Sequence, residues 1–325
     1  MHEFLERIEK SLPPLQVKHL RSEPDCYGAS RIISDALGLP FRPYSFASWY
    51  HGWLSWDVKY VETFGIAHPW RKLVATSAHQ RFLSDHGVDA VAVGAPFVYA
   101  FESIGDTIVR QPNSLLVMPP HSIQHYKESW DEEAYIKKIK LLSSDFDYIV
   151  ACVSPSCVSQ NVWIHTLEKY DIPYIVGANM HDSNGLLRMC SILKSFEYVT
   201  TNRVGGHVVY AAYSGCKVSI FGDYLNLESS EFDGDELYIE HPHLVTNVID
   251  ELSKKSVCSK FPFLFVHPKK ASKKVQWASE QLGEGSMKSF FKLSWYLGWW
   301  PHQQIYYFSR RIIRKLKKEI GLFFK

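Results

Sequence analysis

The stretch from 198 to 222, YVTTNRVGGHVVYAAYSGCKVSIFG, constrains the fold of this chain more than any other part of it. Its order predicts a short strand (198–200), a polar turn, a glycine pair (205–206), a helix of small and aromatic residues, and a second buried strand (217–221). A helix N-terminus gathers unpaired backbone N–H groups, and glycines let a ligand approach the backbone closely. The turn is therefore suited to a phosphate group or a sugar ring.

The segment TNRVGGHVVYAAYSGCKV resembles the nucleotide-sugar-binding half of bacterial GT-B glycosyltransferases of surface-polysaccharide synthesis (capsule, lipopolysaccharide, O-antigen). In that family a Ser/Thr-rich turn, a His-bearing helix and an exit strand frame the donor site. Heptosyltransferases, polysaccharide pyruvyltransferases and sugar epimerases are looser relatives of the same pattern. The resemblance implies an α/β fold of GT-B type, with two Rossmann-like, doubly wound lobes facing a cleft.

The length of the chain, 325 residues, favours two domains, and 46% apolar with 22% charged residues is typical of an ordinary folded protein. We expect a cytoplasmic location, because no apolar run is long enough to span a membrane and the first residues are charged rather than apolar. The six cysteines lack zinc spacing and are interpreted as reduced core thiols. A net charge of +2 gives no steering toward nucleic acid, so no nucleic-acid partner is expected.

Residues 1–112 are predicted to form an N-terminal, acceptor-binding lobe. Amphipathic patterns predict helices at 2–20, broken near its two prolines, and at 27–39. An aromatic alternation predicts a strand at 44–49, and 73–93 is typical of a strand-helix-strand unit. We therefore expect a small parallel sheet in this lobe.

A polar stretch at 101–113 is the predicted linker, and 113–287 the predicted nucleotide-sugar-binding lobe. Four successive strand-helix steps indicate a doubly wound parallel sheet, in which ligands bind at the carboxyl ends of the strands. These ends fall at Pro119 to Ser122, Ser154 to Ser156, Asn179 to Ser183, and Thr200 to Gly206. Neither a G-x-G-x-x-G fingerprint nor a Walker A motif is present.

The last part of the chain, 288–325, is aromatic and then basic. Between Arg310 and Lys325 there are seven Lys or Arg residues against one Glu, interleaved with Ile, Leu and Phe. This pattern predicts an amphipathic helix that lies on an anionic membrane surface and makes the protein peripheral at the inner membrane. A final helix packed against the N-terminal lobe is the alternative, and the two are compatible.

The donor side of a GT-B enzyme needs groups that stabilise the leaving phosphate. By the resemblance and the strand ends, the candidates are Ser122, Thr201, Asn202, Arg203, Gly205 and His207, with Ser154, Ser156 and His181 as weaker ones. Of these, Arg203 or His207 is the expected partner of a phosphate. The structural alternative is that Thr201 or Asn202 caps the helix and His207 is a half-buried histidine.

The acceptor hydroxyl needs a general base from the N-terminal lobe. The aromatic segment SWYHGWLSWD offers His51 and Asp57, an imidazole tuned near neutral pH and a carboxylate that would orient it or act itself. In the alternative, His51 is only hydrogen-bonded inside an aromatic acceptor platform. Its predicted acceptor-binding residues are Trp49, Trp53 and Trp56.

Two further motifs are weak. Bacterial sialyl- and Kdo-transferases carry His-Pro and an acidic pair before Gly, whereas here His-Pro occurs at His68, His241 and His267 and the acidic element is reduced to Phe-Asp-Gly at 232–234. A CMP-sugar donor is thus unsupported. Asp145 and Asp147 form a DxD, but they precede a strand and are interpreted as a solvated turn. We expect neither a metal nor a cofactor beyond the nucleotide-sugar substrate.

These patterns together predict a metal-independent glycosyltransferase that moves a sugar from a nucleotide-sugar donor to a lipid-linked or oligosaccharide acceptor. A polysaccharide pyruvyltransferase using phosphoenolpyruvate and a sugar-nucleotide epimerase are alternatives within the same fold. A non-catalytic sugar-binding or scaffold protein is the alternative from another class, and it would tolerate loss of His51, Asp57 and Arg203.

Overall fold

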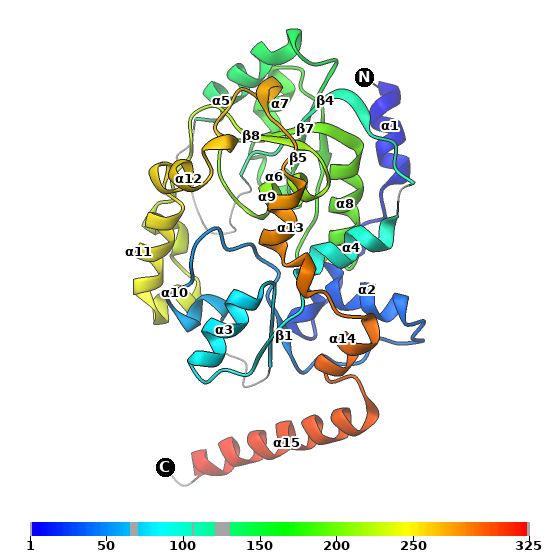
Figure 1. Cartoon of the computed structure of the whole chain (residues 1–325), viewed down its shortest axis with the longest axis vertical. Coiled ribbons are helices and arrows are strands. Elements are labelled where there is room, and N and C mark those ends of the chain that lie inside the picture. Colours follow the sequence, from blue (N-terminus) through cyan, green and yellow to red (C-terminus); the bar gives the residue numbers. More distant parts are fainter. Residues whose placement is uncertain (1, 66–70, 106, 121–130, 324–325) are drawn as a thin grey trace.

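The computed structural model describes residues 2–65, 71–105, 107–120 and 131–323, with side chains as far as 313. It is an α/β structure with two parallel sheets and a long C-terminal helix, as predicted for a GT-B-like chain. The larger sheet and its helices fill the upper half of Figure 1, and the smaller sheet lies below them.

The smaller sheet is formed by the short strands β1 (Ser48–Trp49), β2 (Lys72–Val74) and β3 (Ala90–Ala92), in the order β1-β2-β3. All its pairs are parallel. Helix α3 (Ser77–Asp85) joins β2 to β3 and begins at Thr76, whose side chain accepts a hydrogen bond from the His79 N–H. The predicted strand-helix-strand unit is confirmed, whereas the strand expected at 44–49 is limited to its last two residues.

The larger sheet has five parallel strands in the order β6-β5-β4-β7-β8. The chain starts in the middle of this sheet with β4, runs outward through β5 to β6, then returns to the other side of β4 with β7 and β8. Such a reversal of strand order creates a crevice at the carboxyl ends of the two central strands. The doubly wound arrangement predicted from the apolar runs is thus confirmed, and the crevice expected from this rule falls between β4 and β7. The strands are β4 (Gln111–Val117), β5 (Tyr148–Val153), β6 (Tyr174–Val176), β7 (Phe196–Thr201) and β8 (Lys217–Ile220).

Helices connect successive strands of this sheet, because a parallel crossover needs one. Helix α8 precedes β7, and α9 joins β7 to β8. Helix α1 (His2–Ser11), at the other end of the sequence, packs against the same sheet, where Phe4 contacts the rings of Tyr148 and Phe196. The connecting helices are α5 (Glu132–Lys140), α6 (Pro155–Gln160), α7 (Ile164–Lys169), α8 (Gly185–Ser195) and α9 (Gly206–Tyr213).

Several expected boundaries shift. Residues 12–20 are not helical, because α1 ends at Ser11 before the two prolines. The helix expected at 27–39 is α2 (Ala29–Ala36), preceded by a 3₁₀ turn over Glu23–Gly28. The linker expected at 101–113 is shorter in the structure, because helix α4 (Pro96–Ile104) includes its first residues and strand β4 begins at Gln111.

Between β8 and the tail, where the sequence pattern is weak, further helices run from the large sheet to the smaller one (Figure 1). Tyr60 of the N-terminal lobe contacts the ring of His243, and Lys59 pairs with Glu251 at 2.8 Å. This region therefore bridges the two lobes. Its α-helices are α10 (Glu236–Glu240), α11 (Pro242–Glu251), α12 (Lys254–Lys260) and α13 (Val275–Leu282).

The tail forms α14 (Phe290–Tyr296) and α15 (Pro301–Phe323), which lies along the lower edge of Figure 1. Its first turns pack on the N-terminal lobe, where Tyr307 stacks on Phe46 at 5.0 Å. The predicted packing against that lobe is confirmed for this part of the helix. None of the helices in the described ranges combines the length and the apolar character needed to cross a membrane.

One hydrophobic core is shared by both sheets. Leu73 of the smaller sheet and Leu116 of the larger one belong to the same cluster of buried side chains, and both are fully buried. Helix α4 contributes Phe97 and Tyr99 to this cluster, each at most 1% exposed. The lobes are therefore joined by packed side chains and not by a linker alone.

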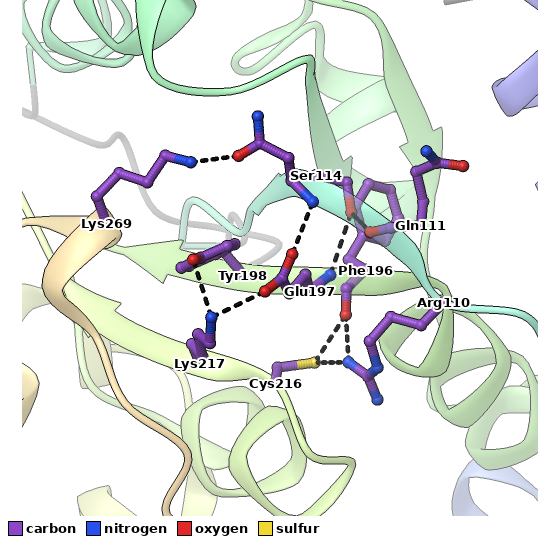
Figure 2. A network of polar contacts seen from close by, with 10 residues as sticks. Arg110, Gln111, Ser114, Phe196, Glu197, Tyr198, Cys216, Lys217 and Lys269 are labelled. Atoms are coloured by element: carbon purple, nitrogen blue, oxygen red, sulfur yellow. Dashed lines mark hydrogen bonds and ion pairs between the residues drawn. The ribbon is translucent and has the colours of Figure 1, made fainter.

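A polar network holds the amino ends of β4, β7 and β8, opposite the crevice (Figure 2). Lys217 donates to the Glu197 carboxylate at 2.8 Å and to the Tyr198 hydroxyl at 2.9 Å. Burial raises the pKa of the Glu197 carboxyl, but Lys217, the backbone N–H of Asn113 and the charge of Lys269 outweigh it and lower that pKa overall. The network accounts for the polar residues at this end of the sheet without a ligand.

Candidate functional site

The two lobes meet where the carboxyl ends of β1 and β7 lead into loops. Tyr210 of α9 donates a hydrogen bond from its hydroxyl to the backbone oxygen of His51 at 2.5 Å. The Tyr210 ring stacks flat on Phe97, with centroids 4.1 Å apart and an interplanar angle of 4°. The loop that carries His51 is thus fixed directly to the helix that follows the glycine pair.

His51 lies in an aromatic environment. The ring of Tyr27 packs 5.4 Å from its imidazole, and Nδ1 is buried without a hydrogen-bond partner among the described residues. Burial lowers the pKa of His51, because desolvation disfavours the imidazolium. The imidazole is therefore neutral at pH 7, the form in which a histidine accepts a proton.

Asp57 does not orient His51, contrary to the expectation from the sequence. Its side chain is exposed, and its charge acts on His79 of α3. Burial lowers the pKa of His79 to about 4, and the nearby Asp57 carboxylate only partly offsets this effect. The predicted pair is absent because the chain bends at Trp56 and the Asp57 carboxylate lies near His79 instead.

The turn after β7 is organised by its own side chains. The Thr201 hydroxyl accepts from the Arg203 N–H at 3.3 Å and donates to the Arg203 carbonyl at 3.1 Å. Asn202 is 1% exposed and donates to the Asp223 carbonyl. Thr201 and Asn202 therefore shape the turn from inside. Neither caps α9, contrary to the structural alternative, because the N-cap residue is Gly205 and no side chain caps it.

Arg203 is not placed to receive a phosphate. Its guanidinium binds the Glu231 carboxylate through two nitrogens, at 2.9 and 2.6 Å, and also donates to the carbonyls of Leu225 and Asn226. Side chains of the pair are only 14% and 4% exposed. We correct the expected role accordingly, since Arg203 anchors the segment after β8. No local pattern indicated this partner, which lies 28 residues away.

The glycine pair at the start of α9 lies beside two aromatic rings. A Cβ on Gly205 would lie 3.1 Å from the His207 ring, which is tighter than ordinary contact. At Gly206 a Cβ would meet the Tyr210 ring at 3.6 Å, an ordinary contact. His207 is half-buried beside this N-terminus. Of the predicted donor residues, Gly205 and His207 therefore lie together at the start of α9, with Nε2 of His207 buried.

The remaining donor candidates fall at neighbouring strand ends. The Ser154 and Ser156 hydroxyls are 2.6 Å apart after β5, where Ser154 also accepts from the Cys157 N–H. His181 is exposed in the loop after β6, and its N–H donates to the Asn179 side chain. Ser122 lies outside the described residues.

The tryptophans of the aromatic segment differ in accessibility. Trp49 is 1% exposed and donates to the Gly94 carbonyl, so it belongs to the core and its expected acceptor-binding role is corrected. Trp53 is 9% exposed and donates to Gln281 of α13. Trp56 is half-buried. Among the predicted acceptor-binding tryptophans, Trp56 is therefore the most accessible.

Sequence patterns did not indicate the close contact between the N-terminal segment (Gln16, Gly28) and the loop after β6 (Asp182, Ser183), which we call the clasp. A Cβ on Gly28 would lie 2.0 Å from the Ser183 carbonyl oxygen, so the two backbones touch. Asp182 is fully buried and accepts from the Gln16 N–H at 2.9 Å. Only the sequence YGAS, with its glycine before a helix, offered a signal for this close approach.

The DxD at Asp145 lies at the amino end of β5, opposite the crevice, as predicted. Asp145 faces His267 at 3.7 Å. Of the other His-Pro pairs, His241-Pro242 starts α11, and His68-Pro69 lies outside the described residues. Within the described ranges, no group of three or more His, Cys, Asp or Glu residues is placed to hold a metal ion.

Comparisons with known proteins give little beyond this geometry. No protein-family model matches the chain, and no curated protein matches it. Among solved structures, a putative UDP-N-acetylglucosamine 2-epimerase from Listeria monocytogenes is similar with 14% identity and a TM-score of 0.31. The match covers 65% of this chain and 56% of that one, so the chain spans little more than half of its length. A similarity of this degree assigns neither a site nor an activity.

Proposed function

We propose that this protein is a glycosyltransferase that transfers a sugar from a nucleotide-sugar donor to a lipid-linked or oligosaccharide acceptor in surface-polysaccharide synthesis. One observation carries the proposal: the glycine pair at the start of α9 lies at the sheet's point of strand reversal and is tied to the His51 loop by Tyr210. Ligands of doubly wound sheets bind at this point.

The donor phosphates are proposed to bind the backbone N–H groups at Gly205 and Gly206, with His207 beside them. A helix N-terminus offers both hydrogen-bond donors and the positive end of the helix dipole. Arg203 contributes indirectly, since its ion pair with Glu231 fixes the turn that leads into α9.

His51 is the proposed general base for the acceptor hydroxyl. Its neutral imidazole and its position across the junction from α9 support this role. Trp56 is the proposed acceptor contact of the same loop. Asp57 is exposed and lies near His79, and we propose no catalytic role for it.

The C-terminal helix is proposed to hold the protein at an anionic membrane surface. Ile305 and Ile312 lie two turns apart on α15 and are 71% and 59% exposed, whereas Phe308 between them packs on Phe46. Arg310 and Arg311 lie on the same helix. An exposed apolar stripe flanked by cations is the pattern of an interfacial helix.

A thermal-shift screen against CMP, UDP, GDP, dTDP and phosphoenolpyruvate tests the donor site. A ligand that binds only the folded protein, at about 100 times its dissociation constant, adds about 2.7 kcal/mol to its stability. We expect one nucleotide to raise the midpoint and Gly205→Ala to reduce that rise. Gly285→Ala is the matched control, because a Cβ there meets no atom within 4 Å.

The outcomes separate the candidate functions. A shift with phosphoenolpyruvate alone would favour a pyruvyltransferase, and a nucleotide sugar epimerised without an acceptor would favour an epimerase. No shift with any of the ligands would contradict the donor site and leave a non-catalytic sugar-binding or scaffold protein. If a nucleotide binds but His51→Ala transfers sugar at the normal rate, His51 is not the base.

A further inference from the structure

A pocket lies away from the junction, between the N-terminal segment, α2 and the loop that follows α2. Its volume is about 420 Å³, within the range of small-molecule sites. Four cationic side chains line it, against Asp35 as the one carboxylate of the lining. The cations are Lys18, Arg21, Arg31 and Arg42.

Part of this positive charge is not neutralised by the protein. Nζ of Lys18 has no ion-pair partner within the described part of the chain. Nε of Arg42 is buried without a hydrogen-bond partner there, although its terminal nitrogen pairs with the buried Asp25 at 3.3 Å. Burial lowers the pKa of Arg42, and the charges of Arg21 and Arg31 lower it further, while the carboxylates of Asp25 and Asp35 offset these effects only in part. An anion in the pocket would relieve this repulsion.

The cations are held in place by other contacts. Arg31 donates to Gln16 at 2.8 Å and to Asn184 at 2.6 Å, so the clasp after β6 fixes its direction. Arg21 donates to the carbonyl of Arg42 at 2.9 Å. A preorganised cluster of guanidinium groups binds phosphate strongly, because each fork offers parallel N–H donors.

The rim of the pocket is apolar and continues toward the C-terminal helix. Phe41 lines it and is 74% exposed. Three residues further on, the Tyr44 carbonyl accepts a hydrogen bond from Gln304 of α15, and the guanidinium of Arg311 lies 5.0 Å from the Tyr44 ring. The loop that carries the pocket's apolar rim is thus the loop on which the proposed membrane helix packs.

We propose that this pocket binds the phosphate or diphosphate group of a membrane-held acceptor lipid, while Phe41 and α15 contact the bilayer around it. This assignment gives the acceptor's chemical class and rests on the proposed transfer function. The phosphate group is common to two sources, a lipid headgroup and a soluble phosphate compound, and the experiment separates them.

The test compares the unsubstituted protein with the double variant Lys18→Gln/Arg21→Gln. The control, Lys254→Gln/Lys255→Gln, removes the same charge from exposed positions on α12. The probes are inorganic pyrophosphate, followed by calorimetry, and phosphatidylcholine vesicles containing phosphatidic acid, followed by co-sedimentation. We expect about tenfold weaker binding of both probes in the pocket variant, as for loss of a charge-assisted hydrogen bond, and little change in the control.

Pyrophosphate weakened with vesicle binding unchanged would overturn the membrane-held source in favour of a soluble phosphate. Neither probe weakened would overturn the site. Lys18→Gln alone, which breaks no ion pair among the described residues, decides the matter if the double variant does not fold. We expect nucleotides to raise the unfolding midpoint of the pocket variants as they do that of the unsubstituted protein. If no nucleotide raises the midpoint of any of these proteins but pyrophosphate still binds, the transfer function is contradicted and the phosphate site is not.

Discussion

The hydroxyl of Tyr210 donates a hydrogen bond to the backbone oxygen of His51, from the C-terminal lobe to the N-terminal one. The donor is on the helix that starts at the glycine pair, and the acceptor is on the loop that carries the proposed base. This bond therefore links the two halves of the candidate site directly, in addition to the core that the lobes share.

Tyr210→Phe removes this bond and leaves the His51 carbonyl without that donor. We expect the free energy of unfolding to fall by about 1 kcal/mol, as for a typical buried hydrogen bond. Urea unfolding measures it, with Tyr306→Phe, at a 54% exposed position, as the control. Equal stability of both variants would show that the bond does not hold the junction.

Arg203→Ala leaves the Glu231 carboxylate buried without its bidentate partner. We expect a loss of about 3 to 5 kcal/mol of unfolding free energy, the cost of breaking a buried ion pair from one side. In the double variant with Glu231→Ala, the loss should be smaller than the sum of the two single losses. If Arg203→Ala kept normal stability and lost only nucleotide binding, the anchoring role would be wrong.

Gly28→Ala places a Cβ 2.0 Å from the Ser183 oxygen at a φ of +82°. We expect a loss of about 3 kcal/mol or more, because the clasp has to open. Gly38→Ala is the matched control, at a φ of +61° with no atom within 4 Å, and should cost only about 1 to 2 kcal/mol of backbone strain. Similar losses in the two variants would contradict the close contact; chemical denaturation compares them.

Stability should fall as the pH drops from about 6.5 to 4. The pKa of His79 is lowered to about 4, so in this window the unfolded chain binds a proton that the folded protein does not. The effect is at most about 3 kcal/mol, because lowering a pKa by one corresponds to about 1.4 kcal/mol. His79→Gln should flatten the pH profile of the unfolding midpoint, whereas His165→Gln, at an exposed position, should not. An unchanged profile in the first variant would refute the buried neutral histidine.

The strand-helix steps of the large sheet could be predicted, because each parallel strand is buried on both faces and is a continuous apolar run. The strands of the smaller sheet are two or three residues long, too short for a clear periodicity. The strand predicted before His51 was therefore longer than the observed one. The helices after β8 were missed because bridging segments that pack on two lobes show no single apolar face.

The candidate site could be predicted only in part. Its location followed from strand order, since a glycine pair after a buried strand marks the carboxyl end of a parallel sheet. The individual roles did not follow, because contacts such as Arg203 with Glu231 or Gly28 with Ser183 join residues distant in the chain. A polar side chain in a loop at the end of a strand can bind a ligand or hold another segment of the protein. Which of the two it does depends on a partner that is distant in the sequence.

The core that runs through both sheets limits how a ligand could reach the candidate site. Rotating one lobe away from the other would separate Leu73 from its cluster with Leu116 and expose close-packed apolar surface to water. At about 25 cal/mol for each Å² exposed, opening only a few hundred Å² would cost several kcal/mol. Access is therefore expected to depend on movements of surface loops, with the two lobes behaving as a single rigid body.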